Sequence, residues 1–252
     1  MFQASYIIQL DTLIKNGSAT SGAIQFIETL KRKRMPFVII TEQSGRIRDH
    51  IADYMVERGF QYISPRDIYT SCMAAVDYMR IRYPKYTKAF YLGGNGMKEA
   101  LEKGGYKIGD DHPDFVLVGM NKKATYSDYS FITIALNDGA QLISTDNRKN
   151  QVADGMRLIG NASVIKMLEY ASDSEAIEFG RGSEILLHMA QSYLSRDSIL
   201  FVGNDFEKDI KPAKNCNFTT VFVNGGRDIS EAGMDEELHP DYIVEDLIGL
   251  TK

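Results

Sequence analysis

The sequence is poor in the features that mark several large classes of protein. It has only two cysteines in 252 residues, and their spacing suggests neither a disulfide framework nor a metal site. Its four histidines show no metal-ligand spacing either. It has no signal-like start and no apolar run approaching about 18 residues, so we expect a soluble, cytoplasmic protein with no membrane partner.

An excess of positive charge is also missing. The formal net charge is −5 and the isoelectric point is about 5.5, which argues against a nucleic-acid partner. The one basic cluster, at residues 31–34, is expected at the carboxyl end of a helix, where the helix dipole favours cations. With 44% hydrophobic and 25% charged residues, the composition is typical of one or two globular domains with a sizeable core.

An apolar, β-branched run at residues 6–13 predicts a buried strand that ends in polar side chains. In an open α/β sheet, ligands bind beyond the carboxyl ends of the strands. We therefore expect Gln9 and Asp11 to lie at a functional site. Their spacing of two predicts that both side chains lie on the same side of an extended segment.

Predicted strands and helices alternate along the whole chain. Apolar residues at helical spacing predict helices that follow the strands at 6–13 and 37–40, and further strands are expected at 199–202 and 219–223. A second series, with strands at 89–92, 115–119 and 142–144, lies between them. This alternation predicts one parallel α/β unit inserted into another.

These motifs resemble the haloacid-dehalogenase superfamily, in its NagD-like, p-nitrophenylphosphatase branch. The resemblance covers essentially the whole chain, and it is carried by the strand end at residues 9–12, the segment 68–79 and the stretch 203–210. It implies a doubly wound, parallel-sheet, Rossmann-like core with an inserted α/β cap domain. The core would comprise residues 1–79 and 176–252, and the cap residues 80–175.

The resemblance assigns the catalytic positions to the first strand end. In the family this strand ends in Asp-x-Asp-Gly, whose first aspartate becomes an aspartyl-phosphate and whose second acts as general acid and base. Here Gln9 stands at the nucleophile position, Asp11 at the acid/base position and Thr12 at the glycine. Because a glutamine amide is neutral and poorly nucleophilic, we expect covalent phosphoryl transfer to be lost or severely reduced.

Four further positions follow from the resemblance. Thr41 would hydrogen-bond a phosphoryl group, although by itself it resembles an ordinary strand-end threonine. Arg181 stands where relatives have a phosphate-binding lysine; it keeps the charge, but arginine and lysine are not interchangeable. Asp209 and Asn204 occupy the two magnesium positions, and Asn204 replaces an aspartate. Magnesium prefers anionic oxygen ligands, so we expect its binding to be weak or absent.

Relatives choose their substrates with cap segments that face the core site. The resemblance assigns this role to Asp146, Asn147, Arg148 and Asn161, within segments that depart from the usual family sequences. Substrate identity therefore does not carry over. The glycine-rich stretch 93–96 lacks the Lys-Ser/Thr of a P-loop, and we interpret it as a turn in the cap.

Three functions remain open from the sequence. The first is a non-catalytic relative that binds a phosphorylated small molecule or phosphate ion, or acts as a regulatory partner. The second is a weak or atypical phosphomonoesterase in which Asp11 acts as general base on a water molecule. The third is a purely structural chain with an empty pocket, for example the subunit of a homodimer formed through its cap. The joint changes at Gln9, Asn204 and Arg181 favour the first.

Overall fold

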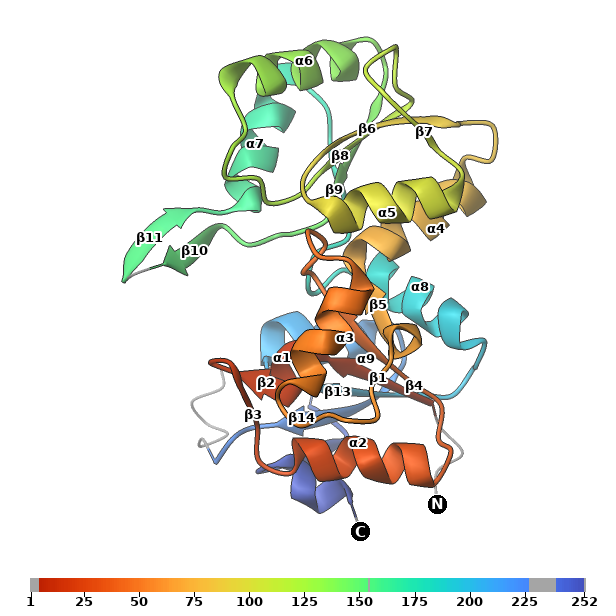
Figure 1. Ribbon diagram of the computed structural model, residues 1–252, viewed down its shortest axis with the longest axis vertical. Helices are drawn as coiled ribbons and strands as arrows, with labels where there is room; N and C mark the ends of the chain where they lie inside the picture. Colours follow the sequence, from red (N-terminus) through yellow and green to blue (C-terminus); the bar gives the residue numbers. More distant parts are fainter. Residues whose placement is uncertain (1–4, 154, 227–238, 252) are drawn as a thin grey trace. The chain divides into compact units, whose positions relative to one another are not determined.

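The computed structural model describes residues 5–153, 155–226 and 239–251, and the chain divides into two compact units (Figure 1). The core unit comprises Met1–Thr41, Arg48–Tyr69 and Gly182–Lys252, and the cap unit comprises Glu42–Ile47 and Thr70–Arg181. This division differs from the expected one, because the boundaries lie near residues 70 and 181 and because a short segment after Thr41 joins the cap unit.

A six-stranded sheet forms the centre of the core unit, in the order β15-β14-β13-β1-β4-β5. The pairings from β15 through to β4 are all parallel, which confirms the predicted parallel α/β core. The strands are β1 (Ser5–Gln9), β4 (Phe37–Thr41), β5 (Ile68–Thr70), β13 (Ile199–Gly203), β14 (Thr219–Val223) and β15 (Tyr242–Val244).

Helices pack on both faces of the core sheet. On one face Ile8 and Ile39 form a cluster with Phe26 of one helix and with residues of the next. On the other face Phe222 packs against Phe206, and two further helices contact β1, β4 and β14. The helices are α2 (Ala23–Arg32) and α3 (Arg48–Val56) on the first face, and α8 (Glu184–Leu194) and α9 (Lys211–Asn215) on the second. No helix in the described ranges is long and apolar enough to span a membrane.

The first strand is shorter than the sequence predicts. Strand β1 ends at Gln9, and the chain enters the short helix α1 (Leu10–Leu13). The expectation that Gln9 and Asp11 share one side of an extended segment is therefore wrong. A helical turn buries Leu10 and Leu13 together, since residues three apart lie on one helix face, and it leaves Asp11 exposed. A small hairpin of β2 (Ile14–Lys15) and β3 (Ser18–Ala19) follows.

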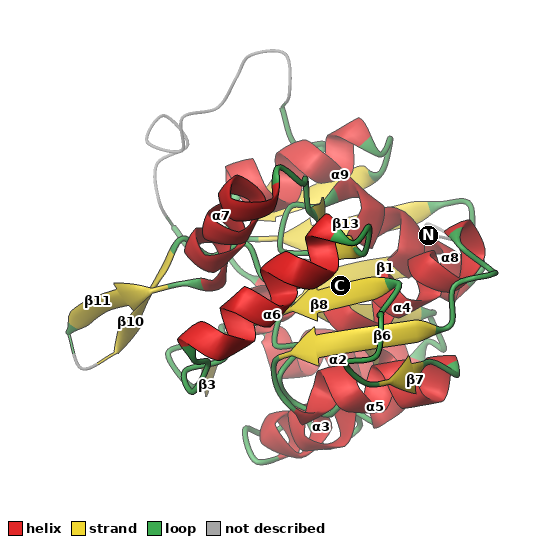
Figure 2. Ribbon diagram, turned by 90° about the horizontal axis from the view of Figure 1, so that it is seen from above, coloured by secondary structure: helices red, strands yellow, loops and turns green. Residues whose placement is uncertain are grey.

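The cap unit has its own sheet of five strands, in the order β12-β9-β8-β6-β7, with every pairing parallel. The strands are β6 (Lys88–Leu92), β7 (Lys107–Ile108), β8 (Phe115–Val118), β9 (Gln141–Ser144) and β12 (Ile177–Glu178). Helices α6 (Tyr126–Asn137) and α7 (Asn161–Ser172) cover one face, and α5 (Asn95–Gly104) lies beside β6 and β7 (Figure 2).

Two contacts explain where the cap unit begins. Helix α4 (Ser71–Arg82), which the sequence assigned mostly to the core, packs along α5. The segment 42–47 approaches the glycine-rich turn so closely that a Cβ on Gly94 would lie 2.3 Å from the Gly45 carbonyl oxygen. The amide of Gly96 also donates to that oxygen at 3.3 Å. Close backbone packing therefore accounts for glycine at positions 94 and 96.

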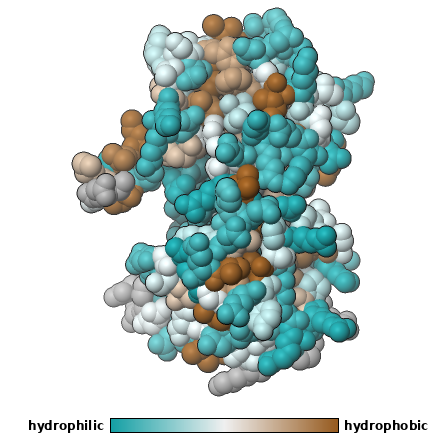
Figure 3. Space-filling model, viewed as in Figure 1, coloured by the Kyte–Doolittle hydropathy of each residue, from teal (hydrophilic) through white to brown (hydrophobic). Residues whose placement is uncertain are grey.

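A β-hairpin that the sequence did not indicate extends from the cap unit. It consists of β10 (Asn150–Ala153) and β11 (Met156–Ile159), paired antiparallel. Several of its apolar side chains are exposed, among them Val152 at 71% and Ile159 at 71%, and they form a hydrophobic group on the hairpin in the space-filling view (Figure 3). The alternation expected of a half-buried strand is absent, so sequence periodicity could not identify it.

Candidate functional site

The polar strand ends of the core unit meet at one edge of its sheet. Strand β1 lies between β13 and β4, with Gln9 opposite Ile40 and Ile8 opposite Val202. Because the three strands are parallel and in register, Gln9, Thr41 and the start of the loop after β13 lie at the same carboxyl edge. This is the position at which open α/β sheets bind ligands.

The Gln9 side chain lies at the centre of this edge. It is only 3% exposed, and no residue in the described part of the chain forms a hydrogen bond with its side chain. A glutamine amide carries two N–H donors and a carbonyl acceptor. Gln9 can therefore contribute hydrogen bonds to a bound molecule, whereas its neutral amide cannot serve as an anionic nucleophile.

Asn204 ties the loop after β13 to the loop after β1. Its side-chain nitrogen Nδ2 donates to the main-chain carbonyl oxygen of Asp11 at 2.9 Å. With an aspartate at this position, a carboxylate oxygen would face the carbonyl oxygen, and two acceptors cannot bond without a proton or a cation between them. The asparagine supplies its own N–H and closes this part of the site.

Asp209 is 1% exposed and is held by the same loop. Its Oδ2 accepts the main-chain N–H groups of Asn204 and Asp205 at 2.9 and 3.0 Å. Gly203 permits this approach, since a Cβ there would lie 2.4 Å from the Cβ of Asp209. Asp205 accepts the amide of Lys208 at 2.9 Å and caps the π-helical turn Phe206–Ile210. Its role in this structure is that of a helix cap.

The described residues do not fit a magnesium site built on several carboxylates. No group of three or more histidine, cysteine, aspartate or glutamate side chains among them is placed to hold a metal ion. Gln9 and Asn204 bring amides to the edge, and the Asn204 nitrogen is directed at the Asp11 carbonyl oxygen. Magnesium prefers oxygen ligands, most often carboxylates and waters, in octahedral geometry.

The four predicted cap residues take part in a polar network inside the cap unit. Asp146 is 1% exposed; its carboxylate accepts the Arg148 amide at 3.0 Å and pairs with the Arg148 guanidinium. Asn147 donates to the Arg181 carbonyl oxygen at 2.6 Å. Asn161, also 1% exposed, donates to two main-chain carbonyl oxygens. These bonds shape the end of the cap sheet, and the substrate-facing role of the four residues stays a prediction.

Glu42 is a member of this network that the sequence did not single out as functional. Its Oε2 accepts the Arg181 amide at 3.1 Å, and its Oε1 lies 3.6 Å from the Arg148 Nε. Its side chain is 10% exposed, so the carboxylate is well shielded from water. The sequence shows an acidic residue directly after the strand-end Thr41, but no spacing rule links it to partners more than a hundred positions away.

The structure thus groups the predicted residues by unit. Gln9, Asp11, Thr41, Asn204 and Asp209 all belong to the core unit, and their strands and loops end at one edge of its sheet. The remaining predicted residues, Arg181 and the four cap positions, belong to the cap unit. The phosphate-binding and catalytic roles of all these residues stay predictions.

Two family models match this chain. One, described as haloacid dehalogenase-like hydrolase, matches residues 9–107, and a related haloacid-dehalogenase hydrolase-like model matches residues 179–250. Together with the parallel core sheet and its inserted cap, they show that the chain belongs to the haloacid-dehalogenase superfamily. Phosphatases of this family typically use magnesium.

Individual relatives indicate which branch of the superfamily this chain resembles. The acid sugar phosphatase of Staphylococcus epidermidis is 28% identical over 247 residues, which cover 96% of this chain and 95% of the relative. The structure of a mutant thermostable p-nitrophenylphosphatase from Bacillus stearothermophilus is 25% identical, with a TM-score of 0.89 and 98% of both chains covered. NagD from Escherichia coli K-12, at 22% identity, shares the fold over 98% of both chains with a TM-score of 0.89. Within the superfamily, the chain falls in the NagD-like, p-nitrophenylphosphatase branch.

Proposed function

We propose that this protein binds a phosphorylated small metabolite at the carboxyl edge of its core sheet and has lost most or all magnesium-dependent phosphomonoester hydrolysis. The observation that carries this proposal is the Gln9 side chain, which is buried at the carboxyl edge with its hydrogen-bonding groups unused by the described residues. The family resemblance assigns this position to the nucleophile. An amide placed in this way can bond to a phosphate oxygen. It cannot form an aspartyl-phosphate.

Asn204 supports the second part of the proposal. Its amide already satisfies the Asp11 carbonyl oxygen, so this part of the site is complete without a cation. Two amides in place of two carboxylates also remove two negative charges, which is the charge that a bound magnesium ion would otherwise balance. The residues that keep the charge of the family are Asp11, Asp209 and Arg181. We therefore infer that magnesium binds weakly or not at all.

Turnover of p-nitrophenyl phosphate with magnesium tests the loss of hydrolysis. We would compare the unmodified protein with Gln9→Asp and with the double variant Gln9→Asp/Asn204→Asp. Restoring the nucleophile and the metal carboxylate should raise turnover by at least about a thousandfold, since removing the nucleophile of a covalent enzyme can cost about a millionfold. Magnesium-dependent turnover of the unmodified protein at the level of the double variant would contradict the proposal.

A charge-matched control separates the metal position from a general effect of added charge. Asn121 lies in the cap unit, and its Oδ1 accepts the Lys123 amide at 2.9 Å, a bond that an aspartate would keep. Gln9→Asp/Asn121→Asp therefore carries the same charge as the double variant but lacks the restored carboxylate at position 204. It should remain at least about tenfold less active at the same magnesium concentration, because magnesium prefers carboxylate ligands.

Binding is tested separately from turnover. Isothermal titration of the unmodified protein with p-nitrophenyl phosphate, in buffer with EDTA, should show binding that Gln9→Leu weakens by about tenfold through loss of the amide hydrogen bonds. Gln191 is a suitable control, because its amide contacts only the Asp197 carbonyl oxygen among the described residues. Gln191→Leu should leave the affinity unchanged. No binding by the unmodified protein would contradict a phosphate-ester site.

A weak phosphomonoesterase that uses Asp11 is a second candidate function. Asp11 is retained and exposed on the turn after β1, while its main-chain carbonyl is held by Asn204. An exposed carboxylate at the edge of the site can act as general base on a water molecule. If turnover persists in EDTA and Asp11→Asn abolishes it, this second function replaces the first.

A further inference from the structure

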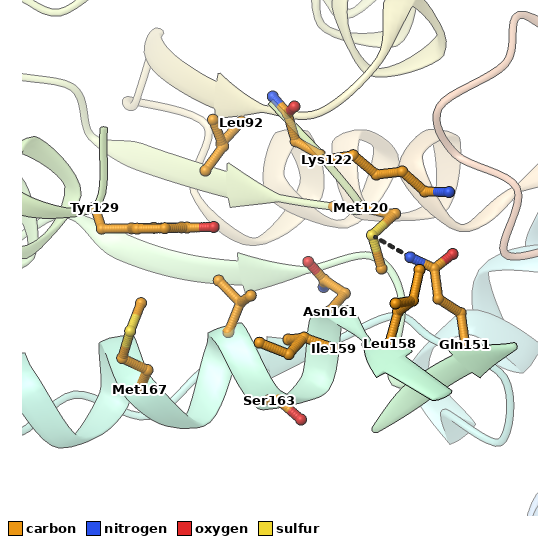
Figure 4. Close-up of a pocket in the computed structure, with 13 residues that line it drawn as sticks. Leu92, Met120, Lys122, Tyr129, Gln151, Leu158, Ile159, Asn161, Ser163 and Met167 are labelled. Atoms are coloured by element: carbon orange, nitrogen blue, oxygen red, sulfur yellow. Dashed lines mark hydrogen bonds between the residues drawn. The ribbon is translucent and has the colours of Figure 1, made fainter. Parts of the chain in front are cut away.

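A pocket of about 510 Å³ lies at the carboxyl edge of the cap sheet, and its lining comes entirely from the cap unit (Figure 4). Strand β6 contributes its last residue, and the loop at 119–122 follows β8. Helices α6 and α7 and the hairpin β10–β11 complete the lining. Both the volume and the position, beyond the carboxyl ends of parallel strands, are typical of small-molecule sites.

Most of the pocket wall is apolar. Leu92, Leu158 and Val164 line it with aliphatic groups, and Met120 and Met167 add two thioethers. The hairpin is held against the loop after β8, where the Gln151 Nε2 lies 3.5 Å from the Met120 sulfur (Figure 4). A ligand that enters this pocket must therefore present an apolar body. Methionine sulfur packs favourably against aromatic rings, which favours a ring over an alkyl chain.

Asn161 provides a buried polar group in this apolar wall. The residue is 1% exposed, and its Nδ2 donates to the Asp146 carbonyl oxygen at 2.8 Å and to the Val118 carbonyl oxygen at 3.3 Å. These two acceptors fix the orientation of the amide, because exchanging its oxygen and nitrogen would place the oxygen against two carbonyl oxygens. The carbonyl oxygen Oδ1 is thereby directed into the pocket (Figure 4).

The described part of the chain contains no donor to this Oδ1. A ligand N–H or O–H group that enters the pocket can therefore donate a hydrogen bond to it. Tyr129 lies in the same pocket, with its ring along the wall and its hydroxyl directed toward the centre (Figure 4). Its ring offers a stacking surface for a second ring.

We propose that the cap pocket binds a small apolar ring compound that carries an N–H or O–H donor, with this donor bonded to the Oδ1 of Asn161. The apolar walls take up the body of the ligand, and the Asn161 Oδ1 selects for the donor. The inference rests on the cap unit alone and does not depend on the proposed phosphate site of the core unit.

Indole and 1-methylindole form a matched pair of probes, because both are apolar bicyclic rings and only indole carries an N–H donor. Isothermal titration of the full chain should show binding of indole and about tenfold weaker binding of 1-methylindole, the effect expected from the loss of one hydrogen bond. Equal affinities, or no binding of indole, would overturn the proposal. Neither probe carries phosphate, so failure here is distinct from failure of the core site.

Pairs of variants test whether indole binds in the cap pocket. Val164→Phe adds a ring to the pocket wall and should weaken indole binding by about tenfold or more, while Val152→Phe, on an exposed hairpin position outside the pocket lining, should leave it unchanged. If Val164→Phe unfolds, Met167→Trp against Met156→Trp gives the same comparison at two partly exposed methionines. Equal affinities within the pair would place indole elsewhere and overturn the assignment.

Discussion

Two asparagines, one in each unit, carry out the same local task with different consequences. Asn204 follows the central part of the core sheet and donates to the Asp11 carbonyl oxygen. Asn161 opens helix α7 beside the cap sheet and donates to the carbonyl oxygens of Val118 and Asp146. Both therefore hold main-chain carbonyl groups at the carboxyl edge of a parallel sheet, where loops leave such groups without strand partners.

The two asparagines differ in how deeply they are buried. Asn204 is partly exposed, and its neutral amide bonds to the Asp11 carbonyl oxygen at the core edge. Asn161 is buried, and its second polar atom faces an apolar pocket. The same residue type therefore completes one edge and leaves an acceptor open to a ligand at the other, because Asn161 uses only its Nδ2 to bond to the main chain.

A substitution that disturbs the close backbone packing in the cap unit should give the largest loss of stability. A Cβ on Gly96 would lie 2.2 Å from the Arg46 carbonyl oxygen and 2.5 Å from that of Ser44. Gly96→Ala should lower the free energy of unfolding by about 3 kcal/mol, because backbone atoms must move apart. Gly109→Ala, where nothing lies within 4 Å, should change it by less than about 0.5 kcal/mol. Urea unfolding measures both, and similar losses would contradict the close packing.

Replacing each asparagine with alanine measures how much each one contributes to the free energy of unfolding. Asn161→Ala removes buried hydrogen bonds and leaves a small cavity, so we expect a loss of about 2 kcal/mol in the free energy of unfolding. Asn204→Ala should cost less than about 1 kcal/mol, because water can reach the partly exposed Asp11 carbonyl oxygen. The same urea titrations apply. A larger loss at position 204 than at 161 would reverse the assigned burial of the two sites.

Replacing one acidic residue in each unit should give the smallest changes in stability, and the two changes should depend on pH in opposite directions. Burial raises the pKa of Glu178 in the cap unit, so its folded form binds a proton more readily than its unfolded form. Its contribution to stability is present at low pH and is lost as pH rises through the raised folded pKa. Glu178→Gln should therefore be more stable relative to the unmodified protein at pH 7 than at pH 4, as measured by thermal unfolding.

Asp241 of the core unit should behave in the opposite way. Burial acts to raise its pKa, but hydrogen bonds from Lys214 and Thr220 outweigh that effect and the pKa is lowered. Its contribution is present above the unfolded pKa, about 3.9, and is lost as pH falls through the folded value. Asp241→Asn should flatten the acid limb of the stability curve between about pH 5 and pH 3. An unchanged acid limb would contradict this role.

The sequence predicts most of the fold because long periodic segments determine it. The strands that end at Gln9, at Thr41 and just before Asn204 were all predicted from continuous apolar runs, and the main strands of the cap unit were predicted in the same way. The sequence did not predict the short strands β7 and β12 or the hairpin β10–β11. A strand of two residues is too short to show a hydrophobic period, and the hairpin has exposed apolar residues instead of the alternation of a half-buried strand. The turn at Asp11 was missed because a single helical turn resembles the end of a strand.

One of the two candidate sites could likewise be predicted from the sequence and the other could not. The core residues could be predicted because each follows a recognisable strand, and strand ends of a parallel sheet meet at one edge. The cap pocket could not, because it depends on which way one amide faces and on a hairpin folding beside Met120. Glu42 illustrates the same limit, since its partners Arg148 and Arg181 are distant in sequence.

Magnesium titration tests whether Asn204 completes the core edge without a cation. Isothermal titration would compare the unmodified protein with Asn204→Asp and with the charge-matched control Asn121→Asp. We predict that Asn204→Asp binds magnesium at least about tenfold more tightly than the other two, because its carboxylate would face the Asp11 carbonyl oxygen across a position suited to a cation. Magnesium binding by the unmodified protein as tight as that of Asn204→Asp would show that Asn204 does not replace a cation.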